Sequence, residues 1–448
     1  MSDCNLQQLD NGKWWCPRCD PHKRRLLPVN AKRNCKPRAK RRSRGLGDTV
    51  AKLTAAVGIT PCKGCKKRQR KLNQWFPYKA DTKKPRVAFW SPGLRMGGAE
   101  RWTVDLARHL DRDRVDVAGI GIGRRDCDPH LLDLARQAGP VLFDRGAIKQ
   151  CFKGVDLVVF WGSKPPGYPR HSLFVSHGGG QWAKGLAARI TDWGIPLAAV
   201  SQFAANAFPD PADVRVVHNG VSVERLEPAA GREATRRRLG LEPDELAVGF
   251  VGRMTACKNP LAAQLAVEHL DRPARAVYVG PIEKPVAAAL DAATPKPIRT
   301  GRREDLGDIY AALDCFVLAS PSEGFSLARI EAWQCGVPTV STPVGAVPEL
   351  ETRHGRLTVR VPVDPTGPEL AAAVAEAVSP ENRATVEHAQ AVAREHYTAQ
   401  AMAARWADVL EEICQKTKKK KKHHRGTEGT EKEKGEREKR KKGETQEP

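Results

Sequence analysis

The sequence predicts an α/β protein with two consecutive domains, each a parallel sheet covered by helices. Its 448 residues are too many for one compact domain. Hydrophobic residues make up 40% and charged residues 28%, as is usual for soluble globular proteins. Through the middle of the chain, short β-branched runs alternate with helical stretches, which is typical of strands connected by crossover helices.

The first series of strands and helices precedes residue 222. Short apolar runs, rich in β-branched residues, predict strands at 86–89, 115–122, 155–160, 172–176, 197–200 and 214–217. Helical patterns between them predict helices at 99–110, 129–137 and 181–190. We therefore expect the first α/β domain at 85–222, after a cysteine-containing extension at 1–84.

A second series begins near Leu246, and the domain boundary falls within 222–245. Its strands are expected at 246–252, 275–280, 297–300, 315–320, 338–342 and 357–363. Its helices are expected at 259–270, 284–293, 303–314 and 326–335. The second domain is predicted at 223–384, followed by helices at 385–414 and a low-complexity, disordered tail at 415–448.

The formal charge of +23 is concentrated at the two ends of the chain. Residues 1–84 hold 23 Lys and Arg against 5 Asp and Glu, and residues 415–448 hold 14 against 7. Between them, 38 basic residues face 40 acidic ones, so nucleic-acid binding by the core is not expected. The basic ends are either solvated arms or segments that bind phosphate backbones or anionic lipid.

Six of the 12 cysteines lie within the first 65 residues. No secretory signal or membrane-spanning stretch is recognisable, which predicts a cytoplasmic protein and makes metal binding a better explanation than disulfides. Two CxxC pairs could hold a structural zinc ion, although 42 residues separate them. The alternative is a basic segment with unligated thiols. The candidate ligands are Cys16, Cys19, Cys62 and Cys65.

Two glycine-rich segments of the first domain are candidate ligand contacts. In SPGLRMGGAERWTVDLARHL (91–110), Gly97 and Gly98 would let the backbone approach a ligand, and the following helix start favours an anion. In FVSHGGG (174–180), His177 ends a buried strand, on the side where open α/β sheets bind ligands. A turn without a ligand and a structural histidine are the alternatives.

The second domain carries charged residues in two strand-to-helix loops. In FVGRMTACKNP (250–260), Arg253 and Lys258 could clamp a diphosphate, unless they are only solvated surface charges. In SPSEGFSLARIEAWQCGVP (320–338), Glu323 and Glu331 are separated by seven residues, and a helix start lies between them. The peptide N–H groups near this start would cradle phosphate, and Glu331 could accept hydrogen bonds from ribose. The residues at this start are Gly324, Phe325, Ser326 and Leu327.

Together these motifs resemble a retaining glycosyltransferase of the GT-B fold, similar to glycosyltransferase family 4. The resemblance covers about 85–414 and rests on GGAER (97–101), SHG (176–178), VVHNGVSVERL (216–226), VGR…K (251–258) and EGFSLARIEAWQCGVP (323–338). It implies two Rossmann-like, doubly wound domains facing a cleft, with last helices that cross back to the first domain. It also implies a structural role for Asn219 and Gly220.

The resemblance assigns roles to the same residues. Arg253 and Lys258 would bind the diphosphate of the donor, Glu323 would contact the transferred sugar, and Glu331 the ribose. From the first domain, His177 would touch the sugar or the acceptor, and Gly97 and Gly98 would lie against donor phosphate or acceptor.

The implied activity is transfer of a sugar from a UDP-, GDP- or ADP-sugar to an acceptor hydroxyl with retention, in glycan, cell-envelope or glycolipid synthesis. Neither a catalytic metal nor another cofactor is expected, since Arg and Lys supply the positive charge. The donor base, the sugar and the acceptor stay open.

Epimerisation or hydrolysis of a nucleotide-sugar is one alternative. The other is a zinc- and polyanion-binding protein with an inactive core. The basic extensions could also hold an active enzyme at an anionic membrane.

Overall fold

The structure is a computed structural model that describes residues 84–95, 97–169, 171–178 and 181–417, with two short strands nearer the N-terminus. The chain divides into two compact units, residues 1–83 and 84–448. In the first unit, β1 (Gln7–Gln8) and β2 (Trp14–Trp15) pair antiparallel. The four cysteines predicted to bind zinc lie outside the described residues, so that site stays a prediction. No helix of the described part is long and apolar enough to cross a membrane.

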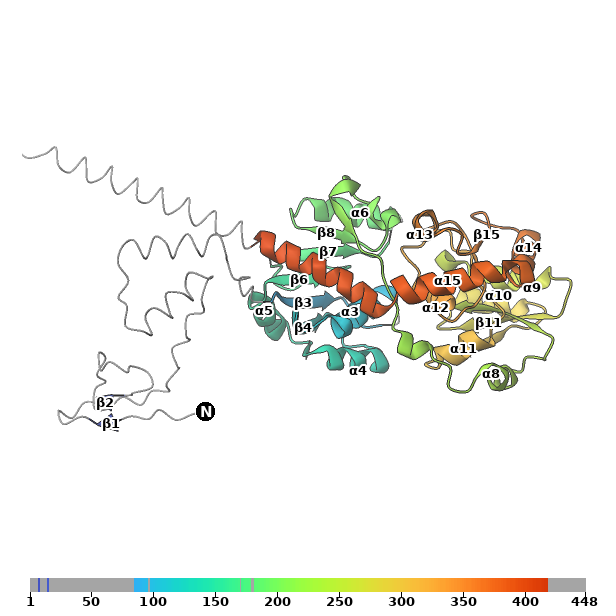
Figure 1. Ribbon diagram of the computed structural model, residues 1–448, viewed down its shortest axis with the longest axis horizontal. Helices are drawn as coiled ribbons and strands as arrows, with labels where there is room; N and C mark the ends of the chain where they lie inside the picture. Colours follow the sequence, from blue (N-terminus) through green and yellow to red (C-terminus); the bar gives the residue numbers. More distant parts are fainter. Residues whose placement is uncertain are drawn as a thin grey trace, which may run out of the picture. The chain divides into compact units, whose positions relative to one another are not determined.

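The second unit begins with a sheet of seven parallel strands (Figure 1) in the order β5-β4-β3-β6-β7-β8-β9. Nearly every residue of its central strands β3, β6 and β7 is buried, because helices cover both faces of the sheet. The strands are β3 (Arg86–Ser91), β4 (Asp116–Ile122), β5 (Val141–Leu142), β6 (Leu157–Phe160), β7 (Ser172–Ser176), β8 (Leu197–Ala199) and β9 (Val214–Val216).

Helices α3 (Gly98–His109), α4 (Pro129–Ala138), α5 (Arg145–Lys153), α6 (Gln181–Thr191) and α7 (Gln202–Ala205) belong to this sheet. Helix α5 and strand β5 were not predicted from the sequence. The reason is physical: β5 has two half-buried residues, and α5 buries only Ile148 and Phe152, so neither leaves a clear apolar period.

The second sheet has six parallel strands in the order β12-β11-β10-β13-β14-β15. They are β10 (Leu246–Val251), β11 (Ala274–Val279), β12 (Ile298–Gly301), β13 (Cys315–Leu318), β14 (Thr339–Ser341) and β15 (Val359–Arg360). The helices are α8 (Arg232–Leu239), α9 (Leu261–Glu268), α10 (Lys284–Ala292), α11 (Leu306–Ala312), α12 (Leu327–Gln334), α13 (Val347–His354) and α14 (Gly367–Ala377).

Both sheets have the same doubly wound topology. In each, the third, second, first, fourth, fifth and sixth strands along the chain lie side by side in that order. The chain direction across the sheet therefore reverses between the first and fourth strands, which are β3 and β6 in one sheet and β10 and β13 in the other. Open α/β sheets bind ligands beyond the carboxyl ends of such strands. The prediction of two consecutive parallel-sheet domains is confirmed.

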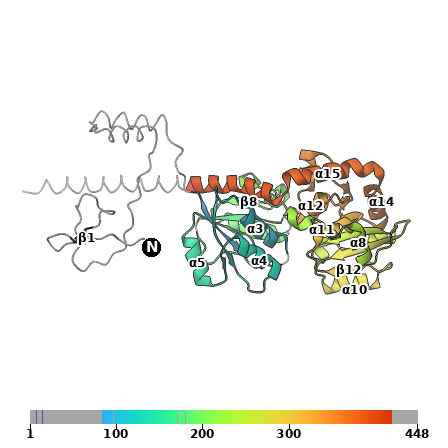
Figure 2. The same ribbon diagram turned by 60° about the horizontal axis from the view of Figure 1, so that its bottom comes forward.

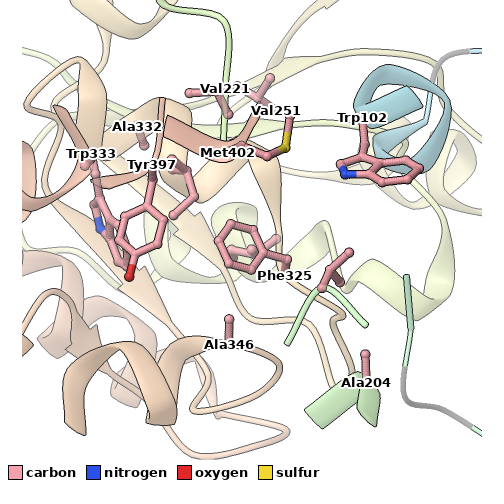
Figure 3. Close-up of a cluster of buried hydrophobic side chains, with 14 of the residues drawn as sticks. Trp102, Ala204, Val221, Val251, Phe325, Ala332, Trp333, Ala346, Tyr397 and Met402 are labelled. Atoms are coloured by element: carbon pink, nitrogen blue, oxygen red, sulfur yellow. The ribbon is translucent and has the colours of Figure 1, made fainter. Parts of the chain in front are cut away.

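The last described helix packs against the first sheet's domain. Helix α15 (Arg383–His396) is followed by a helix at 399–417, which lies along that domain in Figures 1 and 2. The ring of Trp406 meets that of Trp102 at 5.5 Å, edge to face. At the crossing point only glycine fits at 220, because a Cβ there would lie 2.0 Å from the Thr398 carbonyl oxygen. An apolar cluster that includes Met402 fills this junction (Figure 3).

Candidate active site

The loops at the second sheet's reversal point are hydrogen-bonded to each other. After β10, Asn259 takes a left-handed backbone conformation, with φ of 44°, and its side-chain amide donates to the Ala319 carbonyl at 3.3 Å. In return, the Ser320 hydroxyl donates to the Lys258 carbonyl at 3.1 Å. These two bonds hold Lys258 over the carboxyl end of β13 and so bring together two of the predicted motifs.

Lys258 and Glu323 form an ion pair at this position. The Lys258 ammonium lies 2.7 Å from each carboxylate oxygen of Glu323. The Ser320 hydroxyl has a single proton, which it shares between one of these oxygens, at 2.9 Å, and the Lys258 carbonyl. Glu323 is buried, whereas about a third of the Lys258 side chain is exposed, so one face of the ammonium is open to a ligand. Arg253 follows the end of β10, is exposed, and forms no ion pair with any described carboxylate.

Next to this pair, α12 begins with unused backbone donors. Ser326 has a φ of 67° and caps the helix, its hydroxyl accepting from the Arg329 N–H at 3.4 Å. The N–H groups of Phe325, Ser326 and Leu327 find no acceptor within the described ranges. Such N–H groups, together with the positive end of the helix dipole, favour an anion.

A buried cation lies under the same loop. The Arg329 side chain is fully buried, donates to the Phe325 carbonyl at 2.6 Å, and has no partner for its Nε and Nη1 among the described residues. Burial lowers the pKa of Arg329 to about 10, although the negative charges of Glu323 and Glu351 act to raise it. The guanidinium is therefore still charged at neutral pH. Its charge adds to the positive potential at the start of α12.

The loop that carries Glu323 touches the first sheet's domain. A Cβ at Gly324 would lie 2.1 Å from the His177 carbonyl oxygen, and the Ser201 hydroxyl donates to the Gly324 carbonyl at 2.7 Å. The backbone after β7 therefore lies against the loop after β13. This contact requires glycine at 324, and it brings predicted residues of both domains to one place.

The His177 ring packs between two tryptophans. Ring centroids lie 4.6 Å from Trp102 and 6.0 Å from Trp161, both edge to face. Its Nε2 is buried and has no hydrogen-bond partner in the described part of the chain. Burial lowers the pKa of His177 to about 3, so the ring is neutral at pH 7 and acts as a hydrogen-bonding group rather than as a cation.

At the start of α3, the two predicted glycines lie in different surroundings. A Cβ at Gly98 would be 3.8 Å from Leu327, so the start of α3 lies beside the start of α12. A Cβ at Gly97 would meet the Glu100 carboxylate at 2.2 Å. Burial raises the pKa of Glu100, while its backbone hydrogen bond and the charges of Arg253 and Arg95 act in the opposite direction. Glu100 thus already places a carboxylate at the N-terminus of α3.

Glu331 lies about one turn into α12, where it has two partners. The Tyr310 hydroxyl donates to it at 3.0 Å, and Arg225 lies 3.3 Å from its other oxygen. Burial lowers the pKa of Arg225, but the negative charges of the nearby Glu331 and Asp105 raise it by more. The net effect is that the pKa of Arg225 is raised. Burial, and then the Glu331 charge, raise the pKa of Tyr310 well above its usual value, so it stays a donor.

The sequence analysis missed four residues of this site. Arg225 lies within VSVERL and Arg329 within SLARIEAW, and an arginine at an apolar position of a helix could have marked the latter. Tyr310 and Ser320 gave no signal, because a tyrosine in a helix and a serine after a strand are common. Their roles depend on contacts between distant segments.

Part of the second domain is similar in sequence to known proteins. Residues 245–379 match the family described as "Glycosyl transferases group 1". The D-inositol 3-phosphate glycosyltransferase of Streptomyces bingchenggensis is 38% identical over 171 residues, which is 34% of this chain and 37% of that protein. The enzyme of the same name from Mycobacteroides abscessus is 35% identical over 151 residues, which is 31% of this chain and 33% of that protein. The chain thus spans about a third of the length of these relatives.

Solved structures share the fold over a longer stretch. The Anabaena protein Alr3699/HepE, in complex with UDP and glucose, matches with a TM-score of 0.58 and 19% identity, over 73% of this chain and all of that one. A glycosyltransferase from Rickettsia africae matches with a TM-score of 0.60 and 19% identity, over 74% of this chain and 98% of that one. The fold predicted from the sequence, a GT-B-like arrangement of two α/β domains, is confirmed.

Proposed function

We propose that this protein is a glycosyltransferase that moves a hexose from a nucleotide-sugar to an acceptor hydroxyl with retention of anomeric configuration. One observation carries the proposal. At the second sheet's reversal point, the Lys258–Glu323 pair lies beside the unused N–H groups at the start of α12. Cations and free N–H groups suit a diphosphate, and a carboxylate suits the hydroxyls of a sugar.

The comparisons support this proposal in its general form. The matched family and the matched relatives are glycosyltransferases by name, and structures of Alr3699/HepE contain UDP or UDP-glucose. We therefore propose a nucleotide-sugar donor, with UDP to be tested before GDP and ADP. The relatives' names also mention an inositol phosphate, but this chain spans only about a third of them.

Donor binding would use charges that are already in place. An ammonium has three N–H donors, and Glu323 accepts two from Lys258, which leaves the third for a phosphate oxygen. Arg253 is exposed and unpaired within the described residues, so it would turn onto the same diphosphate. Glu331 would accept from the ribose while Tyr310 and Arg225 hold it in position.

In the transfer step, the bond from the anomeric carbon to the phosphate oxygen breaks, and its electron pair leaves with the diphosphate. Arg253, Lys258 and the N–H groups of α12 would stabilise that negative charge. The acceptor oxygen attacks from the same face, and its proton passes to the leaving phosphate oxygen. Glu323 would orient the sugar, and His177, a neutral ring, would contact its hydroxyls. We propose no metal or other cofactor for this step.

A nucleotide-binding measurement tests the proposal. Thermal unfolding of the full chain is followed with UDP, GDP, ADP and their sugars, for wild type and for R253A/K258A. A ligand at 100 times its dissociation constant stabilises the folded state by about 2.7 kcal/mol, which a melting curve resolves. We expect one nucleotide class to raise the melting temperature, and the double substitution to abolish the effect.

The matched control is R237A/K284A, which removes the same charge from two exposed positions elsewhere in the second domain. It should keep the nucleotide response. A wild type that responds to no nucleotide would contradict the proposal and favour the polyanion-binding alternative. In that case, salt-sensitive polyanion binding should disappear when residues 1–84 are deleted. If the enzyme proposal holds, the basic ends are proposed to bring the protein to an anionic membrane surface.

A further inference from the structure

The first sheet has a cavity at its own reversal point, separate from the residues proposed to bind the donor. Its volume is about 840 Å³. It is lined by the loops that follow β3, β4 and β6 and by the start of α5. This size lies within the usual range of small-molecule sites, and the position is where open α/β sheets bind ligands.

Three cations line the cavity: Arg124 follows β4, Arg145 begins α5, and Lys164 lies in the loop after β6. No Asp or Glu is among the lining residues, and none of the three cations forms an ion pair within the described residues. The two carboxylates nearest in sequence are already engaged. Asp126 pairs with Arg95, and Asp144 caps α5 by accepting from the Ala147 N–H at 2.8 Å.

The remaining walls are apolar, with one unused polar atom. Trp90 forms part of the wall, and its indole N–H donates to the Ser163 carbonyl at 2.9 Å, which fixes the loop after β6. The Tyr168 hydroxyl is buried and has no partner within the described part of the chain. Lys164 rests over the Tyr168 ring, with its ammonium 4.1 Å from the ring centre.

We propose that this cavity binds the acceptor and that the acceptor carries a phosphate group. The inference rests on the proposed function, since a glycosyltransferase needs a second ligand site, for its acceptor, in addition to the donor site. Three cations without a carboxylate leave an excess of positive charge. A phosphate monoester, with a charge of about −1.5 to −2 at pH 7, offsets more of it than a carboxylate does. Guanidinium groups also match phosphate oxygens in geometry.

The donor diphosphate is a less suitable occupant of this cavity. Arg253 and Lys258, proposed to hold that diphosphate, belong to the second sheet's loops and do not line the cavity. The same phosphate chemistry could belong to a soluble sugar or polyol phosphate or to the headgroup of a phospholipid, and the experiment separates these two sources.

The experiment measures equilibrium binding to the full chain in the presence of saturating UDP. The soluble probes are glucose 6-phosphate against glucose, and glycerol 3-phosphate against glycerol. The lipid probes are phosphatidylglycerol vesicles against phosphatidylcholine vesicles. The test variant is R124Q/R145Q, and the matched controls are K149Q and K153Q, which remove exposed charges of α5 that do not line the cavity. Because all these positions are exposed, the variants should fold, as a melting curve will show.

For a phosphorylated probe, we expect tighter binding than for its phosphate-free partner and about a tenfold loss in R124Q/R145Q, the usual effect of one charged hydrogen bond. The controls and the affinity for UDP should be unchanged. If R124Q/R145Q loses affinity only for phosphatidylglycerol vesicles, the phosphate belongs to a lipid headgroup. If it loses affinity only for the soluble phosphorylated probes, the phosphate belongs to a soluble acceptor. Equal binding of phosphorylated and plain probes, or equal losses in K149Q and K153Q, would overturn the inference. If none of UDP, GDP and ADP binds, the proposed function fails instead.

Discussion

The two sheets share one strand order, yet the reversal point of each has a different arrangement of charge. In the second sheet, Lys258 and Glu323 lie 2.7 Å apart, and hydrogen bonds join the surrounding loops. In the first sheet, Arg124, Arg145 and Lys164 surround a cavity that no carboxylate lines. Topology thus determines where loops converge, whereas the side chains of those loops determine what can bind there.

The difference predicts different responses to substitution. A paired site is held together by its own charges, so removing one partner leaves the other buried and uncompensated. An unpaired site loses little stability when a cation is removed, because each of its cations is solvated until a ligand arrives. Substitutions should therefore affect folding and turnover together at the second reversal point, but ligand affinity alone at the first.

The largest expected effect is that of Lys258→Ala. Loss of the ammonium removes positive charge that we propose stabilises the leaving diphosphate, and such losses lower turnover by about a hundredfold to a thousandfold. Glu323, which is buried, would also lose its partner, so the free energy of unfolding should fall. The measurements are nucleotide release from the nucleotide-sugar and unfolding in denaturant.

The companion variant is K258A/E323Q. It removes both charges and should restore part of the lost stability, while turnover stays low. If Lys258→Ala left both turnover and stability unchanged, the pair would be only a surface contact, and the contrast between the two reversal points would disappear.

A smaller effect is expected for Gly324→Ala. The new Cβ would lie 2.1 Å from the His177 carbonyl oxygen, so backbone must move, at a cost of about 1–3 kcal/mol. Because the same loop carries Glu323, nucleotide affinity should fall as well. The matched control is Gly98→Ala, whose Cβ would meet Leu327 at an ordinary 3.8 Å and should leave the melting temperature nearly unchanged. Equal melting temperatures for the two variants would contradict the close packing of the loops after β7 and β13.

The same contrast explains how much the sequence could predict. The segment 323–338 is contiguous, so it indicated the Glu323–Glu331 spacing and the helix start, and the structure places Glu323 against Lys258. The cavity of the first sheet draws on loops after three strands and on α5, and its three cations lie outside the motifs recognised in the sequence. Its cations looked like ordinary surface charges, because only the strand order brings them to one place.

Contacts between segments account for the other omissions. Arg225 meets Glu331 from a segment more than a hundred residues earlier in the chain, and Tyr310 reaches it from α11. The α/β pattern was predictable, since buried parallel strands are continuous apolar runs, but the short β5 and the largely exposed α5 were not. Periodicity reveals buried elements; it does not reveal which exposed side chains share a surface.

The smallest expected effect concerns His177 and appears only with pH. Its folded-state pKa, about 3, lies below the 6.5 of the exposed side chain, so protons bind preferentially to the unfolded chain. The stability due to the neutral ring is fully present above pH 6.5 and is lost as pH falls towards 3. Between pH 7.5 and 5.5, this group should cost the wild type about 1.4 kcal/mol of unfolding free energy.

Denaturant unfolding of wild type, H177Q and H171Q at the two pH values measures this effect. H177Q should lose less stability than wild type on acidification, because the buried ring is gone. H171Q removes a histidine whose ring is hydrogen-bonded to the Phe152 carbonyl, but it keeps His177, so it should follow the wild type. If H177Q and wild type lost equal stability, the His177 ring would be solvated rather than enclosed by Trp102 and Trp161. The site would then be more open on its first-domain side than the packing of these rings indicates.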